Sequence, residues 1–205
     1  MQLNLGCGTK KLPGFVNIDI REEVNPDLIE DITKLESIKD ESVDLIYACH
    51  VLEHINFWDV RKVLIRWYDI LKPGGILRLS VPDMDAVFAH YFYWKDLKAL
   101  RGFLWGGGDH EYNIHYSGWD YETLKEKLED CFFDNIQLWN WHDIPPHNYI
   151  DDYSQVYWPT KNCDYRKNYP HVEGKLMSLN IEGVKPEGTK TGGTKTGGDN
   201  PNVPT

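Results

Sequence analysis

The chain has 205 residues, of which 41% are hydrophobic and 13% aromatic, enough for one compact domain with a full-sized core. Its formal net charge of −10 argues against a general nucleic-acid-binding surface, because such a chain repels a phosphate backbone. No apolar run approaches the roughly 18–20 residues of a membrane span, and we expect no secretory signal at the start of the chain. The four cysteines are widely spaced, without a C-x-x-C pair, which indicates a reducing cytoplasm rather than a zinc ribbon or a disulfide scaffold.

The first elements are two short strands joined by a glycine turn. Gln2–Leu5 is apolar and leads directly into Gly6-Cys7-Gly8. The second strand, Val16–Ile20, is rich in β-branched residues. The ten residues between the two strands lie near the lower limit for a parallel crossover, so a full helix barely fits there.

A strand, a helix and another strand follow. Val43–Ala48 has the pattern of a buried strand, and Asn56 is a candidate N-cap for the next helix. The apolar residues that recur at spacings of three and four in that helix are Val60, Val63, Leu64, Trp67 and Leu71. Lys72-Pro73-Gly74-Gly75 should end the helix, and Ile76–Val81 predicts the next strand.

The second half predicts two more helices and a final pair of strands. One helix is expected over Met84–Leu100, and Asp120 is expected to cap a second helix over residues 121–133. A loop rich in glycine and histidine lies between them. The strands are expected at Asn135–Trp141 and Leu176–Val184.

This order of elements predicts a single α/β domain over residues 1–185, built on an open, mostly parallel sheet with a terminal antiparallel strand pair. Residues 142–172 form an insertion that is crowded with proline and aromatic residues. The tail, residues 186–205, repeats glycine, threonine and lysine and lacks a run of apolar residues, so we expect it to be disordered.

Ligands of open α/β sheets bind beyond the carboxyl ends of the strands. That rule selects four places, listed here in chain order: Gly6-Cys7-Gly8, Asp19, Asp31-Ile32 and Ala48-Cys49-His50. Each of them alone is compatible with an ordinary turn or cap. Their order and spacing together indicate a ligand site, in which Asp19 stands where a carboxylate accepts hydrogen bonds from a ribose diol.

The segments LNLGCGTKK, VNIDI, VDLIYACHVLEHI and LKPGGILRLSVP resemble class I S-adenosylmethionine (SAM)-dependent methyltransferases. The chain is most similar to small methyltransferases of the methyltransferase type 11 group, often associated with glycan and cell-surface biosynthesis. The resemblance is strong over residues 1–85 and weaker through residues 106–124 and the last strand. It does not cover the insertion at 142–172 or the tail. It implies a Rossmann-like fold and SAM as cofactor, with S-adenosylhomocysteine as product.

The resemblance also implies roles for individual residues. Those that would surround the methionine part of SAM are Leu5, Gly6, Cys7 and Gly8. Asp19 would hold the ribose hydroxyls, with Ile20 against the adenine. Asp31 would accept a hydrogen bond from the adenine amino group, with Ile32 packed on the ring. Those that would border the methionine and the transferable methyl group are Ala48, Cys49 and His50.

Two departures from the family pattern bear on the cofactor pocket. Asn4 stands where an acidic residue often precedes the glycines, so contact to the amino group of SAM would rely on backbone or water. The first helix of the family is almost missing. The pocket is therefore more open than usual, or it is closed by the 142–172 insertion or by a second subunit in a homodimer.

The motif His50-x-x-Glu53-His54 has three interpretations. In an inverted zincin it would lie within a long helix, which its position directly after a strand does not favour. It is also a common turn of the resembled family, where Glu53 and His54 would secure the chain. In the third interpretation, His50, His54 and His115 face the methyl acceptor and bind it or remove its proton.

A metal-binding variant of this motif is the minority alternative. The resemblance extends to a loop of plant small-RNA 2′-O-methyltransferases, E-x-x-E-H, which holds a divalent cation together with a later histidine. Here His115 or His110 would be that later ligand. One carboxylate is a weak site for Mg²⁺, and the net charge argues against RNA as acceptor. We therefore predict that the histidines line the site without a metal.

The expected activity is transfer of a methyl group from SAM to oxygen or nitrogen of a small-molecule or sugar-containing acceptor. Two alternatives remain open at this point. One is a SAM- or nucleoside-binding module without turnover, which the shortened first helix suggests. The other is a metal-dependent enzyme that uses His50, Glu53 and His54.

Overall fold

The computed structural model describes residues 1–148, 152–158 and 175–188. Seven strands form one sheet in the order β3-β2-β1-β4-β5-β9-β6. In that order their bounds are Leu28–Ile29, Val16–Asp19, Gln2–Leu5, Val43–Cys49, Leu71–Pro82, Ser178–Val184 and Asp134–Leu138. The pairs from β3 to β5 are parallel, whereas β9 is antiparallel to both β5 and β6. The predicted fold class, a mostly parallel sheet with a terminal antiparallel pair, is confirmed.

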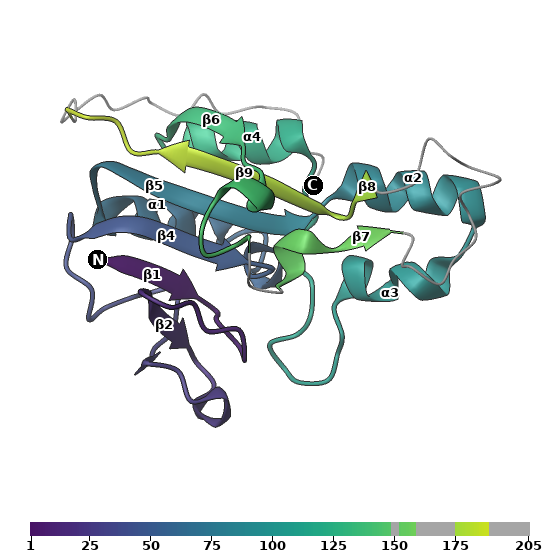
Figure 1. The fold of residues 1–205 in the computed structure, drawn as a ribbon, viewed down its shortest axis with the longest axis horizontal. Helices are drawn as coiled ribbons and strands as arrows, with labels where there is room; N and C mark the ends of the chain where they lie inside the picture. The colour runs from purple at the N-terminus through teal and green to yellow at the C-terminus, as the bar shows by residue number, and fades with distance from the viewer. Residues whose placement is uncertain (149–151, 159–174, 189–205) are drawn as a thin grey trace, which may run out of the picture.

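Four α-helices and a small strand pair complete the described part of the chain. The helices are α1 (Val60–Ile70), α2 (Met84–Trp94), α3 (Leu97–Trp105) and α4 (Tyr121–Asp130). The strand pair is antiparallel and comprises β7 (Tyr157–Trp158) and β8 (Lys175–Leu176). The single turns of 3₁₀ helix are η1 (Glu22–Val24), η2 (Leu52–His54), η3 (Trp141–Asp143) and η4 (Tyr153–Gln155). In Figure 1, β1, β4 and β5 point toward the end of the molecule where α2, α3 and β7 lie.

Apolar strands at the centre of the sheet form the core. Leu3, Ile46 and Leu77, from β1, β4 and β5, are fully buried, as expected for parallel strands that are covered on both faces. Helix α1 packs on the sheet through Trp67, which is also fully buried. The indole Nε1–H of Trp67 donates to the carbonyl of Ile32 at 2.9 Å, so the helix also holds the segment after β3.

The helix predicted over Met84–Leu100 is wrong in one respect, because two helices occupy that stretch. Lys95 adopts a left-handed conformation, with φ of 55°, and ends α2. The side chain of Asp96 then accepts a hydrogen bond from the amide of Ala99 at 3.1 Å and opens α3. The apolar spacing continues across this break, so periodicity alone does not reveal it.

The start of α1 also differs from the prediction. Its N-cap is Asp59, and the side chain of Asn56 accepts from the amide of Trp58 in the turn before the helix. Strand β5 begins at Leu71 rather than Ile76, which makes the Lys72–Gly75 segment part of the strand. A register shift against β4 and the positive φ of Gly74 accommodate this segment in the ladder.

The last elements are shorter than predicted. Helix α4 ends at Asp130, and β6 ends at Leu138. Met177 interrupts the predicted Leu176–Val184 strand and separates β8 from β9. Of the 142–172 insertion, residues 149–151 and 159–172 lie outside the described residues, as does the tail from residue 189 onward. Among the helices that the structure describes, none has the length and apolar character needed to cross a bilayer.

Candidate active site

The predicted cofactor loops meet at a cavity of about 1170 Å³ beyond the carboxyl ends of β1, β2 and β4. The predicted cofactor residues that line it are Gly6, Cys7, Gly8, Asp19, Ile20, Asp31, Ile32, Cys49 and His50. The side chains of Leu5 and Ala48 do not reach it. They are register partners on β1 and β4 and are buried in the core, and their role beside the methionine part stays a prediction.

The glycine turn after β1 has the tight geometry that its sequence predicts. Gly6 and Gly8 adopt φ of +59° and +48°, which side-chain-bearing residues rarely do. A Cβ atom on Gly6 would lie 2.6 Å from Cγ2 of Val51, so the turn and the segment after β4 pack directly against each other. The amide of Cys7 donates to the carbonyl of Ile18 at 3.0 Å. The turn is therefore fixed against both neighbouring strands.

Asp19 is oriented by backbone donors at the end of β2. Its Oδ2 accepts from the amide of Gly8 at 2.8 Å, and its Oδ1 accepts from the amide of Arg21 at 3.0 Å. The residue is only 5% exposed and still lines the cavity. Oδ1 also accepts from Nε of Arg21 at 3.4 Å, whereas Oδ2 keeps one lone-pair position for a hydrogen bond from a ligand in the cavity.

Asp31 also lies at the cavity, on a turn that Thr33 stabilises. Burial opposes ionisation of Asp31, but its hydrogen bonds to the Thr33 hydroxyl (2.6 Å) and amide (2.9 Å) and the nearby Lys34 give it a lowered pKa. Ile20 is 41% exposed, while Ile32 is partly buried against the core. An acidic group and two apolar side chains thus share this end of the cavity.

Asn4 has a structural role at the rim of the cavity. Its side-chain amide donates to the carbonyl of Lys10 at 3.0 Å and to Oδ1 of Asn17 at 2.9 Å. Both N–H groups are therefore used to hold the segment between β1 and β2, which contains no helix. The near absence of the first helix is confirmed, and two buried amides stabilise the loop in its place.

His50 has a strained backbone and a defined ring orientation. It adopts φ of 52°, in the left-handed region, at the end of β4. Its Nε2 lies 2.9 Å from Oγ of Ser178, and its ring packs against Tyr153 at 5.1 Å between centroids. Burial, with smaller contributions from His115 and His54, lowers the pKa of His50 to about 3. The imidazole is neutral at physiological pH.

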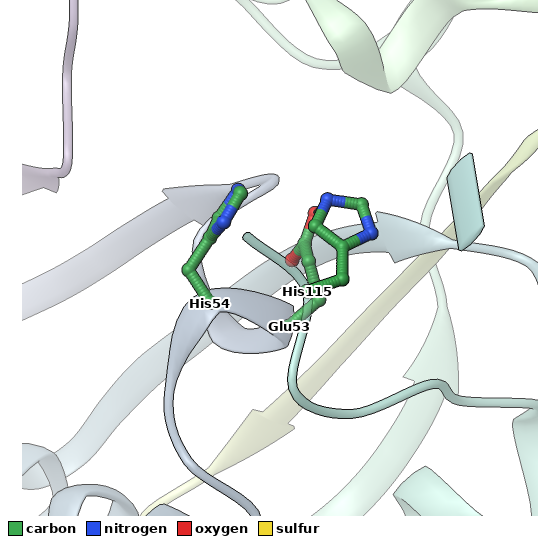
Figure 2. Close-up of side chains that lie close together, drawn as sticks. All are labelled: Glu53, His54 and His115. Atoms are coloured by element: carbon green, nitrogen blue, oxygen red, sulfur yellow. The ribbon is translucent and has the colours of Figure 1, made fainter. Parts of the chain in front are cut away.

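Glu53, His54 and His115 converge at one side of the cavity. Figure 2 shows Glu53 and His54 on the same short helical turn, η2, and His115 on a separate loop. One potential ligand atom from each residue lies within 4.8 Å of the other two. Burial raises the pKa of Glu53 to about 8 and, with the neighbouring His115, lowers that of His54 to about 4. Burial also lowers the pKa of His115.

Backbone hydrogen bonds bring the loop that carries His115 to this cluster. The amides of Tyr116 and Ser117 donate to the carbonyl of Glu53 at 2.8 and 3.3 Å, and the amide of His115 donates to that of Trp105 at 3.2 Å. His110 lies on the same loop, but its Nε2 approaches Asp109, at 3.9 Å, rather than the cluster. Of the two histidines considered from the sequence, His115 is the one that joins Glu53 and His54.

Sequence reasoning missed the polar residues that the insertion contributes. Asp152 and Tyr153 line the cavity, and Oδ2 of Asp152 accepts from the hydroxyl of Tyr47 at 2.7 Å. Tyr47 and Asp152 are 105 positions apart, and although Tyr47 lies in the VDLIYACHVLEHI segment, Asp152 belongs to no motif. No local pattern indicates this contact. Within the part of the insertion that the structure describes, these two residues line the cavity, and closure of the pocket by the insertion stays a prediction.

The thiols at the cavity are unsuited to nucleophilic catalysis. Burial, together with the neighbouring Asp19, raises the pKa of Cys7 to about 11. Burial and the charge of Asp152 raise the pKa of Cys49 well above its usual value. Both thiols are protonated at neutral pH, which is consistent with a packing role beside a ligand.

Comparisons with known proteins agree with this architecture. Residues 15–79 match the family described as a methyltransferase domain. A comparison with curated protein sequences found no relative. Among solved structures, a chain of the complex between the Haloferax volcanii Trm112 methyltransferase activator and a methyltransferase is 18% identical. The match covers 90% of this chain and 82% of that one, with a TM-score of 0.57.

Two further solved structures share the fold, with similar TM-scores. A SAM-dependent methyltransferase from Archaeoglobus fulgidus is 14% identical, with 90% and 85% of the two chains covered and a TM-score of 0.55. One from Thermotoga maritima is 17% identical, with 90% and 81% covered and a TM-score of 0.56. The matched segment of this chain runs from β2 through most of β5 and includes Asp19 and His50. Residues 15–79 thus match the methyltransferase-domain family, and the chain shares its fold with solved SAM-dependent methyltransferases.

Proposed function

We propose that this protein transfers a methyl group from SAM to oxygen or nitrogen of a small-molecule or sugar-containing acceptor. One observation carries the proposal: a single cavity is lined on one side by the glycine turn and Asp19 and on the other by His50, His54 and His115. The first side offers contacts for a nucleoside and an amino acid. The second side offers imidazole nitrogens to a group that lies next to them.

The residues at the first side suit the cofactor. Gly6 and Gly8 let a ligand approach the backbone closely, and the Asp19 carboxylate, with a free lone pair on Oδ2, suits a hydroxyl of a ribose. Ile20 and Ile32 would hold the adenine, and Asp31 would accept from its amino group. The methionine part would lie along the Gly6–Gly8 turn toward Cys49 and His50. Leu5 and Ala48 would support these loops from the core.

When bound, SAM supplies an electrophilic methyl group, and the protein's contribution is to align the acceptor with it. The sequence alone suggested histidines with a pKa near neutrality. Burial instead keeps His50 and His54 neutral well below pH 7, which makes them weak bases. Their unprotonated nitrogens would accept hydrogen bonds from the O–H or N–H of an acceptor. The proposal therefore gives these histidines, with His115, an orienting role.

The charge of the cavity lining bears on the class of acceptor. The acidic residues that line it are Asp19, Asp31, Asp59, Asp109, Glu111 and Asp152. The basic ones are Lys10, Arg21, Lys34 and Lys62. With a net charge of −10 on the chain as well, a neutral or cationic acceptor is favoured over a nucleic acid.

Calorimetric titration with S-adenosylhomocysteine tests the cofactor site. We expect the wild type to bind, and Asp19→Asn to bind about 10- to 100-fold more weakly, because the amide replaces a charged acceptor of the ribose hydroxyls. Glu22→Gln is the matched control. It changes a carboxylate to an amide three residues away, on an exposed position outside the cavity, and should bind like the wild type. Absence of binding by the wild type, or equal affinity in Asp19→Asn, would contradict the proposal.

A further inference from the structure

The carboxylate of Glu53 is buried without a hydrogen-bond donor. The residue has no exposed surface, and neither oxygen has a hydrogen-bond partner among the described residues. Two ring nitrogens lie near its Oε1, namely Nδ1 of His50 at 3.4 Å and Nε2 of His115 at 3.9 Å. A buried acidic group that lacks donors is costly, so its surroundings should contain a compensating partner.

The hydrogen bonds of His54 and His115 determine which ring nitrogens carry protons. Nδ1 of His54 lies 3.1 Å from the carbonyl of Ile114, and Nδ1 of His115 lies 3.0 Å from that of Phe103. A carbonyl only accepts, so each Nδ1 must be the protonated, donating nitrogen. In the neutral ring, each Nε2 then carries an unshared electron pair. Such a backbone contact on the far nitrogen is the usual support of a metal-binding histidine.

The same reasoning applies to His50. The hydroxyl of Ser178 donates its single proton to the carbonyl of Tyr153 at 2.6 Å. It must therefore accept from Nε2 of His50, which lies 2.9 Å away. This leaves an unshared pair on Nδ1 of His50, the nitrogen nearest Glu53. Three imidazoles thus present acceptor nitrogens around a carboxylate that is itself an acceptor.

This cluster of acceptors without donors would be stabilised either by a proton on Glu53 or by a cation between the groups. A protonated carboxyl would donate to one nitrogen at roughly 2.6–3.0 Å and would leave the other two without a donor. The observed separations of 3.4 and 3.9 Å are longer than that. A cation satisfies several acceptors at once, and the distances favour it.

We propose that Glu53, His54 and His115 bind a divalent first-row transition-metal ion. Their ligand atoms already lie within 4.8 Å of one another, and ligands about 2.1 Å from a tetrahedral ion lie about 3.4 Å apart. Two imidazoles and one carboxylate suit Zn²⁺, Mn²⁺ or Fe²⁺ better than Mg²⁺ or Ca²⁺, which prefer oxygen ligands. Figure 2 shows these three side chains side by side.

The placement of the cluster indicates what the ion would do. His54 and His115 line the cavity, whereas Glu53 lies behind them, so the remaining coordination positions would face the cavity. An ion there would bind an oxygen of the acceptor, such as a hydroxyl or a carboxylate, and hold it beside His50. His54 and His115 would then orient the acceptor through the ion, in place of direct hydrogen bonds. This role rests on the proposed methyl transfer, and it narrows the acceptor to a compound that offers such an oxygen.

Titration of the chelator-treated, full-length protein with Zn²⁺ tests the site, using a chromophoric competitor to report free metal. We expect one ion per chain. Glu53→Gln, His54→Ala and His115→Ala should each weaken binding by about 100-fold. His110→Ala is the matched control, because this histidine lies on the same loop outside the cluster, and it should bind like the wild type. Circular dichroism of each variant checks that it is folded.

Glu53→Gln separates the two ways of relieving the cluster. If a proton on Glu53 alone relieves the cluster and the wild type binds no Zn²⁺, the proposal is overturned. Equal Zn²⁺ affinity in His110→Ala and His115→Ala, or in Glu53→Gln and the wild type, also overturns it. Titration of the metal-free protein with S-adenosylhomocysteine keeps the two proposals distinct, because the glycine turn and Asp19, which would hold the cofactor, are not among the three ligands. Cofactor binding without metal binding contradicts only the metal site.

Discussion

His147 shows at the scale of one residue how burial sets the charge of an imidazole. It has no exposed surface and packs against Tyr47 and Trp139, with ring centroids 4.3 and 5.0 Å away. Neither ring nitrogen has a hydrogen-bond partner among the described residues. Burial, and then the charge of Arg78, lower the pKa of His147 to about 4. The folded protein therefore holds this ring in its neutral form.

This lowered pKa predicts that the protein is less stable against unfolding in acid. The unfolded chain binds a proton at His147 near pH 6.5, whereas the folded chain does so only near pH 4, so the free energy of unfolding falls as the pH drops between these values. His147→Phe should reduce that fall by up to about 3 kcal/mol, measured by urea unfolding at pH 7 and pH 4.5. His142 lies at an exposed position, so the free energy of unfolding of His142→Phe should fall with pH as that of the wild type does. Equal falls in both variants would contradict the assignment.

Single residues were predicted well where a motif constrained them. Asp19 lies at the end of β2 and faces the cavity, as its position after a β-branched strand indicated. The choice between His110 and His115 could not be made from sequence, because both lie on one loop at similar distances along the chain from Glu53. Backbone hydrogen bonds from residues 116 and 117 to Glu53 decide it.

At the scale of elements, the loop between α3 and α4 places a functional side chain far from its neighbours in sequence. The loop leaves α3 through Gly106, which has φ of 79° and ψ of 173°. Only glycine adopts this region readily. A Cβ atom there would lie 2.5 Å from the carbonyl oxygen of Asn113, so the two ends of the loop are in close contact. Gly106 thus lets the chain return to the cluster with His115.

Two glycines of this loop make a matched pair for mutation. Gly106→Ala should destabilise the protein by about 2–3 kcal/mol, because it adds both backbone strain and a clash. Gly108→Ala also meets a positive φ, of +63°, but its Cβ would enter open space, and we expect about 1 kcal/mol. Urea unfolding at pH 7 measures both. Equal losses would mean that the contact with Asn113 does not constrain the loop.

The same scale shows where sequence periodicity fails. The apolar pattern of residues 84–100 predicted one helix, but the left-handed Lys95 and the N-cap Asp96 divide it. Leu100, on α3, packs with Val87, on α2, in one small cluster, so the second helix turns back onto the first. Tertiary packing outweighs the helix propensity of the linking residues, and such packing leaves no local signal.

At the scale of the whole molecule, the cavity joins segments from most of the described chain. The loops after β1, β2 and β4 line one part of it, while residues 102–116 and residues 152–153 line another. Figure 1 shows the origin of this arrangement, because α3, its following loop and η4 lie beyond the carboxyl ends of the parallel strands. A ligand that fills the cavity would connect both groups of segments.

Hydrogen exchange on the whole protein should report this connection. Saturation with S-adenosylhomocysteine is expected to slow amide exchange in residues 6–9 and 19–21, and also in residues 109–113, since all of them line one cavity. At 100 times its dissociation constant the ligand should add about 2.7 kcal/mol to the free energy of unfolding. Peptides of α4, which lies apart from the cavity, serve as the internal control. Protection restricted to residues 6–21 would show that the cofactor reaches only one side.

The sequence by itself determined the alternation of the main strands and helices, the glycine turn and the positions of Asp19 and Asp31, because short-range patterning and backbone sterics govern them. The tertiary structure decided which histidine joins Glu53 and His54, where the α2–α3 break falls, and how Tyr153 comes to lie against His50. These features depend on contacts between residues that are distant in sequence. They arise only when the packed sheet and its backbone hydrogen bonds bring such residues together.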